Sequence, residues 1–525
     1  MQHSLGQYFL NSAQCYPQKT ALICERGSFT YTELLDQVTA LSNLFIEQGI
    51  KKGDRIVICT GNTFETAVSY WAVLLCGACV AVVSDEQPAA KIAYIIENCS
   101  AKVFITTASL ANDVIRQLPK QSSLECLYTI DSSDAISGSH IKCAAFPESS
   151  SCVEAKFDEN IISEDLASLV YTSGSTGEPK GVTLTHANMC CALDSLNTYL
   201  KNSNDDVFLN VLPLSFDYGL YQMIMAFSKG ATLVLEKDLV WPLAVMKKVA
   251  QYKCTVLPAV PVLVELFEKF NALAKVDFST VRCVTNTGAA LRESHISALK
   301  SLFSRADIYS MYGLTECKRC TYLPPEDLER KPGSVGIAIP NTEIMVLSDS
   351  GTPCIAGEVG QLVVRGGTVM RGYWNNDEAT NARIKEHPIY GGKCLFTGDY
   401  GYLDEDGYFY FKGRMDEVLK VRGKKLIPKE IEETLVQLNE VEEASVICLE
   451  NPDSDPNVVA LVTLISGSEM SSADLKLHCT KNLEAFQVPT DFYMLKSFPR
   501  NQNGKIDKPQ LRKDLEANSL QLVAS

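Results

Sequence analysis

Residues 166–181, LASLVYTSGSTGEPKG, place a loop of hydroxyl and glycine residues directly after a strand-like apolar run. Four hydroxyl side chains lie between positions 172 and 176, and Lys180 adds a positive charge. Donors of this kind can surround the β- and γ-phosphates of a nucleotide. The stretch is not a Walker A loop, which needs Gly-Lys-Ser/Thr at the start of a helix, because Pro179 precedes this lysine. A flexible Ser/Gly turn is the plain alternative.

Around this loop, apolar strands alternate with amphipathic helices. Runs such as RIVICT, CVAVVS and ATLVLE have the composition of buried strands, and TYTELLDQVTALSNLFIEQGI has helical periodicity, with Thr30 and Glu33 near its start. This alternation predicts α/β layers with parallel strands. The serine-rich segment 131–152 predicts an exposed loop.

The pattern changes twice toward the C-terminus. Near residue 340, GTPCIAGEVGQLVVRG and YGYLDEDGYFYFKG predict hairpins of an antiparallel β subdomain. Beyond Asp416, the helical stretches IPKEIEETLVQL and SADLKLHCTKNL flank the strand-like EASVICLE and VVALVTLI. We therefore predict an α/β protein with a large N-terminal domain (1–415), made of layered α/β subdomains and the antiparallel subdomain. A small, mobile α+β domain (416–525) follows.

Composition limits the classes of ligand. The 525 residues include 48 Lys plus Arg and 63 Asp plus Glu, for a net charge of −15. Such a chain lacks the long-range attraction that nucleic acid or an anionic membrane requires, so a site for an anionic ligand must be built locally. The N-terminus has neither a basic start nor an apolar core of a signal peptide, and we expect a cytoplasmic protein.

Two further features were candidates for other functions. Residues 66–84 carry no charge over a length that could span a membrane, but Gly77 interrupts them and acidic residues border them, which favours a buried helix and strand. Nineteen cysteines include the CxxC pairs at 76/79 and 317/320. We expect buried thiols in a reducing compartment, with metal binding as the weaker alternative.

Five more motifs follow the hydroxyl-rich loop in order: YGLTE (312–316), GGTVMRGYW (366–374), TGD (397–399), GRMD (413–416) and NGK (503–505). Together with the loop they resemble the AMP-forming adenylating superfamily, which includes acyl-CoA synthetases, adenylation domains of nonribosomal peptide synthetases and firefly luciferase. The resemblance covers nearly the whole chain. It implies that ATP and Mg²⁺ activate a carboxylate as its adenylate, with release of pyrophosphate, before transfer to a thiol.

The resemblance also implies roles for particular residues. Lys505 bridges the carboxylate and the α-phosphate, Thr315 donates to that phosphate, and Glu316 holds Mg²⁺. Taken singly, Lys505 could be a solvated surface lysine, Asp399 could cap a turn and Tyr312 could be a core residue. Asp416 is expected to be the hinge of the C-terminal domain, with a rigid linker as the alternative. The ATP contacts implied are Thr172, Ser173, Gly174, Ser175, Thr176, Gly177, Lys180, Gly288, Ala289, Ala290, Met311, Tyr312, Gly313, Asp399, Arg414 and Lys420.

The stretch LPLSFDYGLYQ (212–222) bears on which acid is activated. Members that activate amino acids carry Phe-Asp here, so Asp217 is expected to pair with a substrate ammonium, since a carboxylate in an apolar pocket needs a cation. A helix cap is the alternative role. Phe216, Tyr218, Tyr221 and Cys320 would form the pocket wall with it. Lys318 and Arg319 depart from the small or apolar residues usual in peptide-synthetase domains, which leaves a second anionic contact open.

YGLTECKRCTYLPPEDLERKPGSVGIAIPN looks most like the stand-alone prolyl ligases of pyrrole, prodiginine and anatoxin-type pathways. The favoured interpretation is a ligase that loads L-proline onto the phosphopantetheine arm of a separate carrier protein. An acyl-CoA ligase for a small carboxylic acid is the alternative, with coenzyme A as the acceptor. A non-catalytic nucleotide-binding scaffold is disfavoured because every motif keeps its reactive residue.

Overall fold

The computed structural model describes residues 4–131, 141–147, 154–158, 160–173, 178–237, 241–288, 291, 293–417, 419–421, 424–449, 457–465, 467–500, 506–517 and 519–520. The chain divides into two compact units. The first comprises residues 1–344 and 364–396, and the second comprises residues 345–363 and 397–525. The boundary predicted at 415/416 lies inside the second unit and stays a prediction.

The first unit contains a nine-stranded sheet whose central neighbours run parallel, as the sequence predicts. Its two edges are antiparallel. In spatial order the strands are β16 (Ile337–Ala338), β15 (Thr321–Leu323), β14 (Asp307–Tyr312), β13 (Cys283–Asn286), β12 (Val256–Pro258), β10 (Val207–Asn210), β11 (Thr232–Leu235), β1 (Thr20–Cys24) and β2 (Gly27–Thr30).

An eight-stranded sheet forms the other layer of the first unit. It is parallel through β4, β3, β5, β6 and β7 and ends in antiparallel pairs at β8–β9 and β9–β19. Its spatial order is β19 (Gly372–Tyr373), β9 (Pro179–Thr185), β8 (Leu166–Ser173), β4 (Cys79–Val82), β3 (Arg55–Cys59), β5 (Val103–Thr106), β6 (Cys126–Thr129) and β7 (Lys142–Ala145). Strand β7 falls in the serine-rich segment predicted as a loop, because Lys142–Ala145 pairs with β6 despite its weak apolar pattern.

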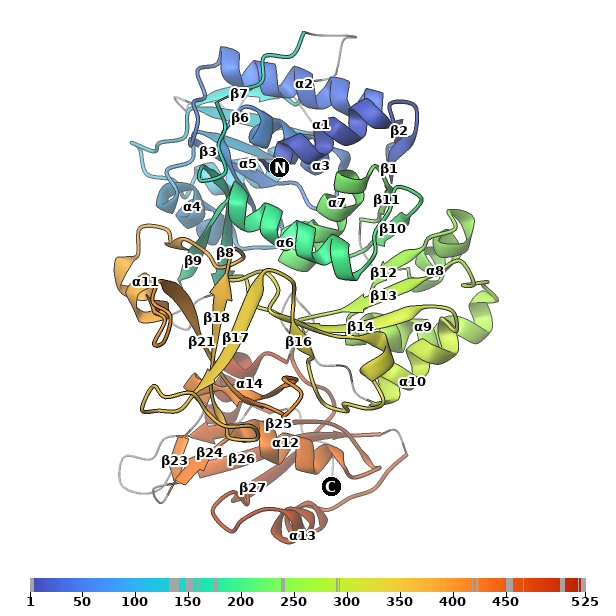
Figure 1. Ribbon diagram of the computed structural model, residues 1–525, viewed down its shortest axis with the longest axis vertical. Helices are drawn as coiled ribbons and strands as arrows, with labels where there is room; N and C mark the ends of the chain where they lie inside the picture. Colours follow the sequence, from blue (N-terminus) through green and yellow to red (C-terminus); the bar gives the residue numbers. More distant parts are fainter. Residues whose placement is uncertain are drawn as a thin grey trace. The chain divides into compact units, whose positions relative to one another are not determined.

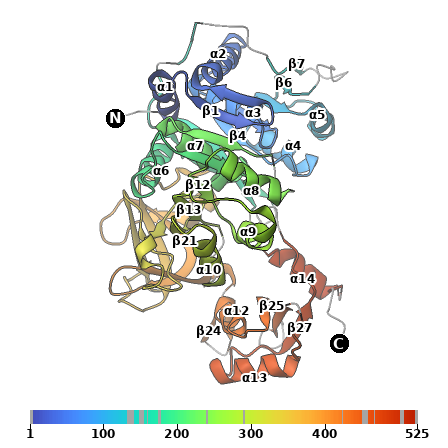
Figure 2. The same ribbon diagram turned by 90° about the vertical axis from the view of Figure 1, so that its right-hand side faces the viewer.

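Helices cover the sheets: Figure 1 shows α9 and α10 along strands β12 to β14, and Figure 2 shows the same helices beside β12 and β13. Helix α2 begins where the sequence analysis placed Thr30 and Glu33, and these two residues form a capping box. The uncharged segment 66–84 forms buried helix α3 and strand β4, as predicted. The helices of this unit are α1 (Leu5–Cys15), α2 (Tyr31–Glu47), α3 (Phe64–Leu75), α4 (Ala89–Asn98), α5 (Ala108–Ile115), α6 (His186–Tyr199), α7 (Asp217–Lys229), α8 (Pro242–Gln251), α9 (Pro261–Ala274), α10 (Glu293–Leu302), η1 (Pro325–Asp327) and α11 (Asp377–Arg383).

A third sheet, in the order β17-β18-β21-β20 with β22 paired to β21, confirms the antiparallel pieces expected after residue 340. Three of its strands contribute residues to both units. The strands are β17 (Thr342–Leu347), β18 (Gly360–Gly366), β20 (Ile384–Glu386), β21 (Lys393–Leu403) and β22 (Phe409–Arg414).

The rest of the second unit is the predicted α+β fold, in which β25, β26 and β27 form a sheet. One side of this sheet packs on α12 and α13 around a core that includes Leu435, Val446 and Leu475. The mixed α/β class, with a large N-terminal part and a smaller C-terminal part, is therefore confirmed. These elements are η2 (Met415–Glu417), β23 (Leu419–Val421), β24 (Lys424–Leu426), α12 (Pro428–Val436), β25 (Val441–Leu449), β26 (Asn457–Leu464), α13 (Ser472–Asn482), β27 (Asp491–Leu495) and α14 (Lys508–Glu516).

Two of the sequence expectations concern membranes and metals. Over the described ranges, no helix is both long and apolar enough to cross a membrane. Likewise, no three His, Cys, Asp or Glu side chains of the described chain come together as ligands for a metal ion. Most of the described cysteines are buried free thiols, including both CxxC pairs.

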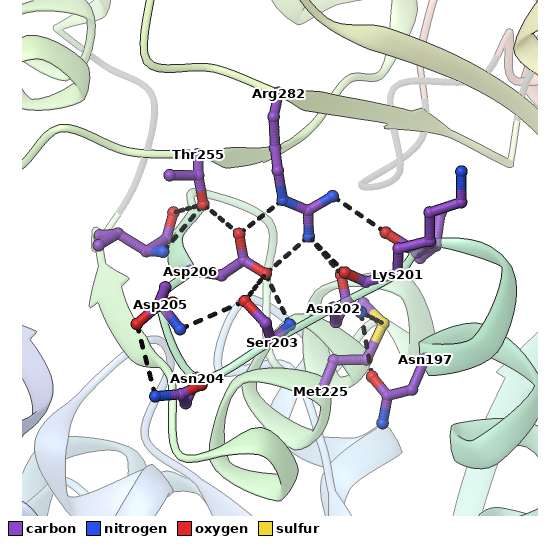
Figure 3. A network of polar contacts seen from close by, with 12 residues as sticks. Asn197, Lys201, Asn202, Ser203, Asn204, Asp205, Asp206, Met225, Thr255 and Arg282 are labelled. Carbon is purple, nitrogen blue, oxygen red and sulfur yellow. Dashed lines mark hydrogen bonds and ion pairs between the residues drawn. The ribbon is translucent and has the colours of Figure 1, made fainter.

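A buried charge network joins three segments of the nine-stranded sheet. Arg282 donates to both carboxylate oxygens of Asp206, from Nε at 2.7 Å and from Nη2 at 2.6 Å, as Figure 3 shows. Thr255 and the backbone of Ser203 donate to the same carboxylate. Burial alone would raise the pKa of Asp206, but these hydrogen bonds, led by Arg282, hold it below its ordinary value. The network fixes the starts of β10, β12 and β13.

Replacing Asp206 with Asn should lower the free energy of unfolding by about 2 kcal/mol, less than for a fully buried pair because Arg282 is partly exposed. Since the folded-state pKa is lowered, the wild-type advantage should be full at pH 7 and shrink as the pH falls below about 4. Urea unfolding of the full chain measures it. Glu343→Gln, which breaks a solvent-exposed pair with Arg365, is the control and should cost under about 1 kcal/mol. An equal loss in both variants would contradict the role of the network.

Candidate active site

The hydroxyl-rich loop connects the two strands of an antiparallel hairpin. Strand β8 pairs with β9, so that Thr172 lies opposite Lys180 and the backbone of Ser173 lies opposite Pro179. Gly174, Ser175, Thr176 and Gly177 lie outside the described residues. The hairpin brings Lys180 back beside the strand that leads into the loop. The predicted phosphate-binding role of the loop stays a prediction.

Segments far apart in the sequence converge beside Lys180. Strand β19 adds to the edge of β9, where Gly372 and Tyr373 pair with Thr183 and Val182. From β19, the Tyr373 hydroxyl donates to Glu316 Oε1 at 2.7 Å, and the Lys180 ammonium lies 5.8 Å from the centre of the Tyr373 ring. The Met370 amide also donates to the Glu316 carbonyl at 2.7 Å. The loop hairpin, the YGLTE segment and the GYW segment thus meet around one tyrosine.

The chain reverses direction sharply after strand β14. The Cys320 amide donates to the Tyr312 carbonyl at 2.9 Å, which closes the turn that contains Thr315 and Glu316. Gly313 is required here, because a Cβ on it would lie 2.5 Å from the Lys318 carbonyl oxygen and 2.8 Å from the Arg319 Cα. Lys318 has φ of 62°, a left-handed conformation that costs an ordinary residue about 1–2 kcal/mol. In this strained turn, the side chains of both Lys318 and Arg319 are buried.

Those cations reach Asp217 at the start of α7. The Lys318 ammonium lies 2.5 Å from Asp217 Oδ1, and Arg319 Nη1 lies 3.3 Å from Oδ2. The helix-cap alternative is wrong: Phe216 is the N-cap and makes no side-chain cap bond, and the Asp217 carboxylate instead accepts from the two cations. The positive charge that the sequence analysis assigned to a substrate ammonium is therefore supplied by the chain itself.

Two tyrosine side chains lie beside this cluster, and both of their hydroxyls donate hydrogen bonds to backbone carbonyls. The Tyr218 hydroxyl donates to the Thr285 carbonyl at 2.5 Å, and the Tyr221 hydroxyl donates to the Met189 carbonyl at 3.3 Å. Burial raises the pKa of both phenols far above the ordinary range, so both remain neutral. Cys320 is buried beside Cys317, with the two sulfurs 3.0 Å apart.

Two further predicted contacts lie near this wall. Gly288 has φ of 86°, and a Cβ on it would contact the Phe216 ring at 3.5 Å. Met311 is buried on β14, where its sulfur accepts from the Tyr199 hydroxyl at 2.9 Å. Ala289 and Ala290 lie outside the described residues.

The remaining predicted residues belong to the second unit. Asp399 on β21 lies opposite Arg414 on β22, and Arg414 Nη1 is 3.0 Å from the buried Asp399 carboxylate. Asp416 is exposed in η2, with Oδ1 3.3 Å from Arg414 Nε. Only the backbone of Lys420 is described, in β23, and Lys505 lies outside the described residues.

Sequence reasoning missed two contacts. Tyr373 was part of a quoted motif but was given no role, because nothing in GGTVMRGYW indicates a partner 57 residues away. Lys318 and Arg319 were noted as departures without being paired to Asp217. Two consecutive cations in a run that leads straight into buried strand β15 were the available signal, because buried cations need a carboxylate partner.

Residues 9–374 match the AMP-binding enzyme family, and residues 430–505 match the AMP-binding enzyme C-terminal domain. The chain belongs to the AMP-binding enzyme family. This AMP-binding enzyme is therefore an AMP-forming ligase that activates an acid with ATP, and ATP and Mg²⁺ are its cofactors.

Several relatives show how wide the family is. The chain is 28% identical to rice (Oryza sativa subsp. japonica) 4-coumarate–CoA ligase 3 over 93% of its length and 87% of that protein. It is 27% identical to tyrocidine synthase 2 of Brevibacillus parabrevis over 97% of its length, but it spans only 14% of that protein. The crystal structure of the anthranilate CoA ligase AuaEII with anthranoyl-AMP superposes with a TM-score of 0.83 at 25% identity, covering 98% of both chains.

The residues of this AMP-binding enzyme fit both cofactors. Glu316 is a half-buried carboxylate held by Tyr373, and Mg²⁺ bound to a nucleotide usually takes one or two protein carboxylates beside phosphate oxygens. Gly288 is left-handed, and a Cβ on it would meet only Phe216 Cζ within 4 Å, so the space beside this glycine suits the approach of a flat group.

Gly313→Ala should distort the turn that carries Glu316, Lys318 and Arg319, because the added carbon meets backbone atoms that cannot rotate away. We expect at least a 10-fold loss of acid-dependent pyrophosphate exchange and a loss of stability of about 1–3 kcal/mol. Gly351→Ala is the control for exchange: its φ of 79° makes alanine strained there, at a cost of about 1 kcal/mol, but its Cβ meets nothing within 4 Å and it lies outside the quoted motifs, so exchange should be unchanged. Unchanged exchange in Gly313→Ala would show that the turn does not position the site.

Proposed function

We propose that this AMP-binding enzyme activates a small carboxylic acid as its adenylate and then transfers the acyl group to a phosphopantetheine thiol. The observation that carries the proposal is the convergence of Lys180, Glu316 and Tyr373. Tyr373 donates to the Glu316 carboxylate and has the Lys180 ammonium 5.8 Å from its ring centre, so residues of three separate motifs meet around this tyrosine. Reaction at a phosphate develops charge on oxygen atoms, and preorganised groups of this kind stabilise it.

The roles proposed for the first unit follow this geometry. Lys180 and the hairpin loop bind the terminal phosphates, Thr315 donates to the α-phosphate, and Glu316 holds Mg²⁺, which neutralises phosphate charge when bound. Tyr312 and Gly288 flank the adenine. Tyr373 keeps the Glu316 carboxylate in place by donating to one of its oxygens. That hydrogen bond leaves the other oxygen for the metal.

The second unit is proposed to supply the ribose and lysine contacts. The Asp399 carboxylate can only accept hydrogen bonds, which suits the two ribose hydroxyls, and its ion pair with Arg414 holds it in place. Lys420 would add a contact to the ribose, and Lys505 would bridge the acid and the α-phosphate. Asp416 is the proposed hinge about which the C-terminal domain changes its face for thioester formation.

The acid is proposed to lie against the aromatic wall of α7, formed by Tyr218 and Tyr221. L-Proline was the substrate suggested by Asp217, and it remains the amino-acid candidate. The ion pairs of Asp217 favour the second candidate, an acid without an ammonium group, because both carboxylate oxygens already face cations. Bringing a third cation into this buried cluster would be costly.

The thiol acceptor is proposed to be either a carrier protein or coenzyme A, since both present phosphopantetheine. The 4-coumarate–CoA ligases among the relatives carry coenzyme A in their names. Tyrocidine synthase 2 does not, and it is a far longer protein than this chain. Assaying thioester formation with each acceptor in parallel decides between them. Both outcomes leave the first half-reaction as proposed.

Lys505→Ala should reduce acid-dependent ATP–pyrophosphate exchange by at least about 10²-fold, the effect of removing one preorganised charge donor. The exchange is measured with a panel of amino acids and simple carboxylic acids. Asp416→Pro is the comparison, because fixing φ at the hinge should spare exchange and slow thioester formation. Near-normal exchange in Lys505→Ala would overturn the assignment of the lysine, and no exchange by the wild type with any acid would overturn the proposed function.

A further inference from the structure

The cluster of Asp217, Lys318 and Arg319 holds more positive than negative charge. All three residues are almost fully buried, with exposed fractions of 6%, 1% and 4%. The single carboxylate is shared between both cations, at 2.5 and 3.3 Å. Among the described residues, no other carboxylate pairs with either cation. A buried charge without a counter-ion is strongly destabilising, so the second cation needs an explanation.

The groups around the cluster do not supply the missing negative charge. The Lys318 ammonium lies 5.6 Å from the centre of the Tyr221 ring, and the Arg319 guanidinium lies 5.4 Å from that of Tyr218. These aromatic faces attract cations weakly, and burial keeps both phenols neutral. Burial lowers the pKa of Lys318 below its ordinary value, and Asp217 opposes this shift only in part. A second carboxylate beside the ammonium would favour its charged form.

Arg319 also has a hydrogen-bond donor to spare. Its Nη1 donates to the Lys318 carbonyl at 2.8 Å and to Asp217, but its Nε has no hydrogen-bond partner within the described chain. Unsatisfied buried donors are rare in native proteins, and a guanidinium can bind a carboxylate with two of its N–H groups. The turn holds these cations in place at the cost of a left-handed Lys318. Strain of this kind is typical of functional sites.

We infer that the acid activated here is a small dicarboxylic acid, whose second carboxylate binds Lys318 and Arg319 while the first reacts with ATP. The inference rests on the proposed function and names the substrate class for the same site. One further negative charge would neutralise the cluster and give Arg319 Nε an acceptor. A monocarboxylic acid would leave the excess charge in place, and an amino acid such as proline would add to it.

Acid-dependent pyrophosphate exchange by the full-length enzyme tests this directly. Succinate, glutarate and adipate are each compared with their monomethyl esters, which keep one reactive carboxyl and lose the second charge. L-Proline and the monocarboxylic acids butyrate and benzoate complete the panel. We expect at least one dicarboxylate to exceed its own ester by about 10²-fold or more in kcat/KM, since a buried donor left unpaired strongly disfavours the analogue.

Variants of Arg319 then test whether this residue causes the preference for the dicarboxylate over its ester. Arg319→Met should reduce the ratio of dicarboxylate to ester by at least 10-fold and leave the KM for ATP within about twofold. Arg319→Lys keeps the charge but lacks Nε, so it should retain more of the ratio than Arg319→Met and less than the wild type. Because each ratio is taken within one variant, a partly unfolded preparation does not change it. The comparison in the wild type requires no variant at all.

The outcomes separate the two proposals. Equal use of an ester and its dicarboxylate, or better use of proline or a monocarboxylic acid, would overturn the inference and leave the acid–thiol ligase intact. The cluster would then be a structural ion pair. No exchange with any acid would overturn the proposed function, and the inference would fall with it.

Discussion

The hydrogen bond from Tyr373 to Glu316 is the contact on which the candidate site depends. Glu316 follows the last strand of the parallel run in the nine-stranded sheet, whereas Tyr373 lies on the edge strand of the eight-stranded sheet. The bond therefore joins the two sheets of the first unit at the hydroxyl-rich hairpin. A second bond, from the Met370 amide to the Glu316 carbonyl, fixes the backbone at the same place. Without this junction, the hydroxyl-rich hairpin and the YGLTE turn would not be held together by a side-chain contact.

The second constraint is the local concentration of positive charge in a chain that is acidic as a whole. The chain carries a net charge of −15, yet two cations are buried around one carboxylate beside the aromatic wall of α7. An acidic protein that binds ATP and an acid must concentrate positive charge where those anions bind. Lys180 is the position proposed for the phosphates. Lys318 and Arg319, held in place by the reversed chain after Gly313, are the position proposed for the acid.

Local signals in the sequence predicted most of the fold. Thr30 and Glu33 form a capping box because their spacing alone satisfies the first backbone N–H groups of α2, and Gly77 separates helix α3 from β4 as expected. Strand β7 was missed because its pairing with β6, not its own composition, makes it a strand. The motif residues were predicted only through the family resemblance. The pairing of Asp217 with Lys318, 101 positions away, depends on the tertiary fold, which no local pattern encodes.

A double-mutant cycle on Tyr373→Phe and Glu316→Gln tests most directly the claim that these two residues form one functional contact. The readout is kcat/KM for acid-dependent pyrophosphate exchange, measured in the wild type, both single variants and the double variant. If the contact organises the site, the double variant loses less than the sum of the two single losses, with a coupling of about 1–2 kcal/mol. Losses that add within about 0.5 kcal/mol would show that the two side chains act independently and would contradict the account.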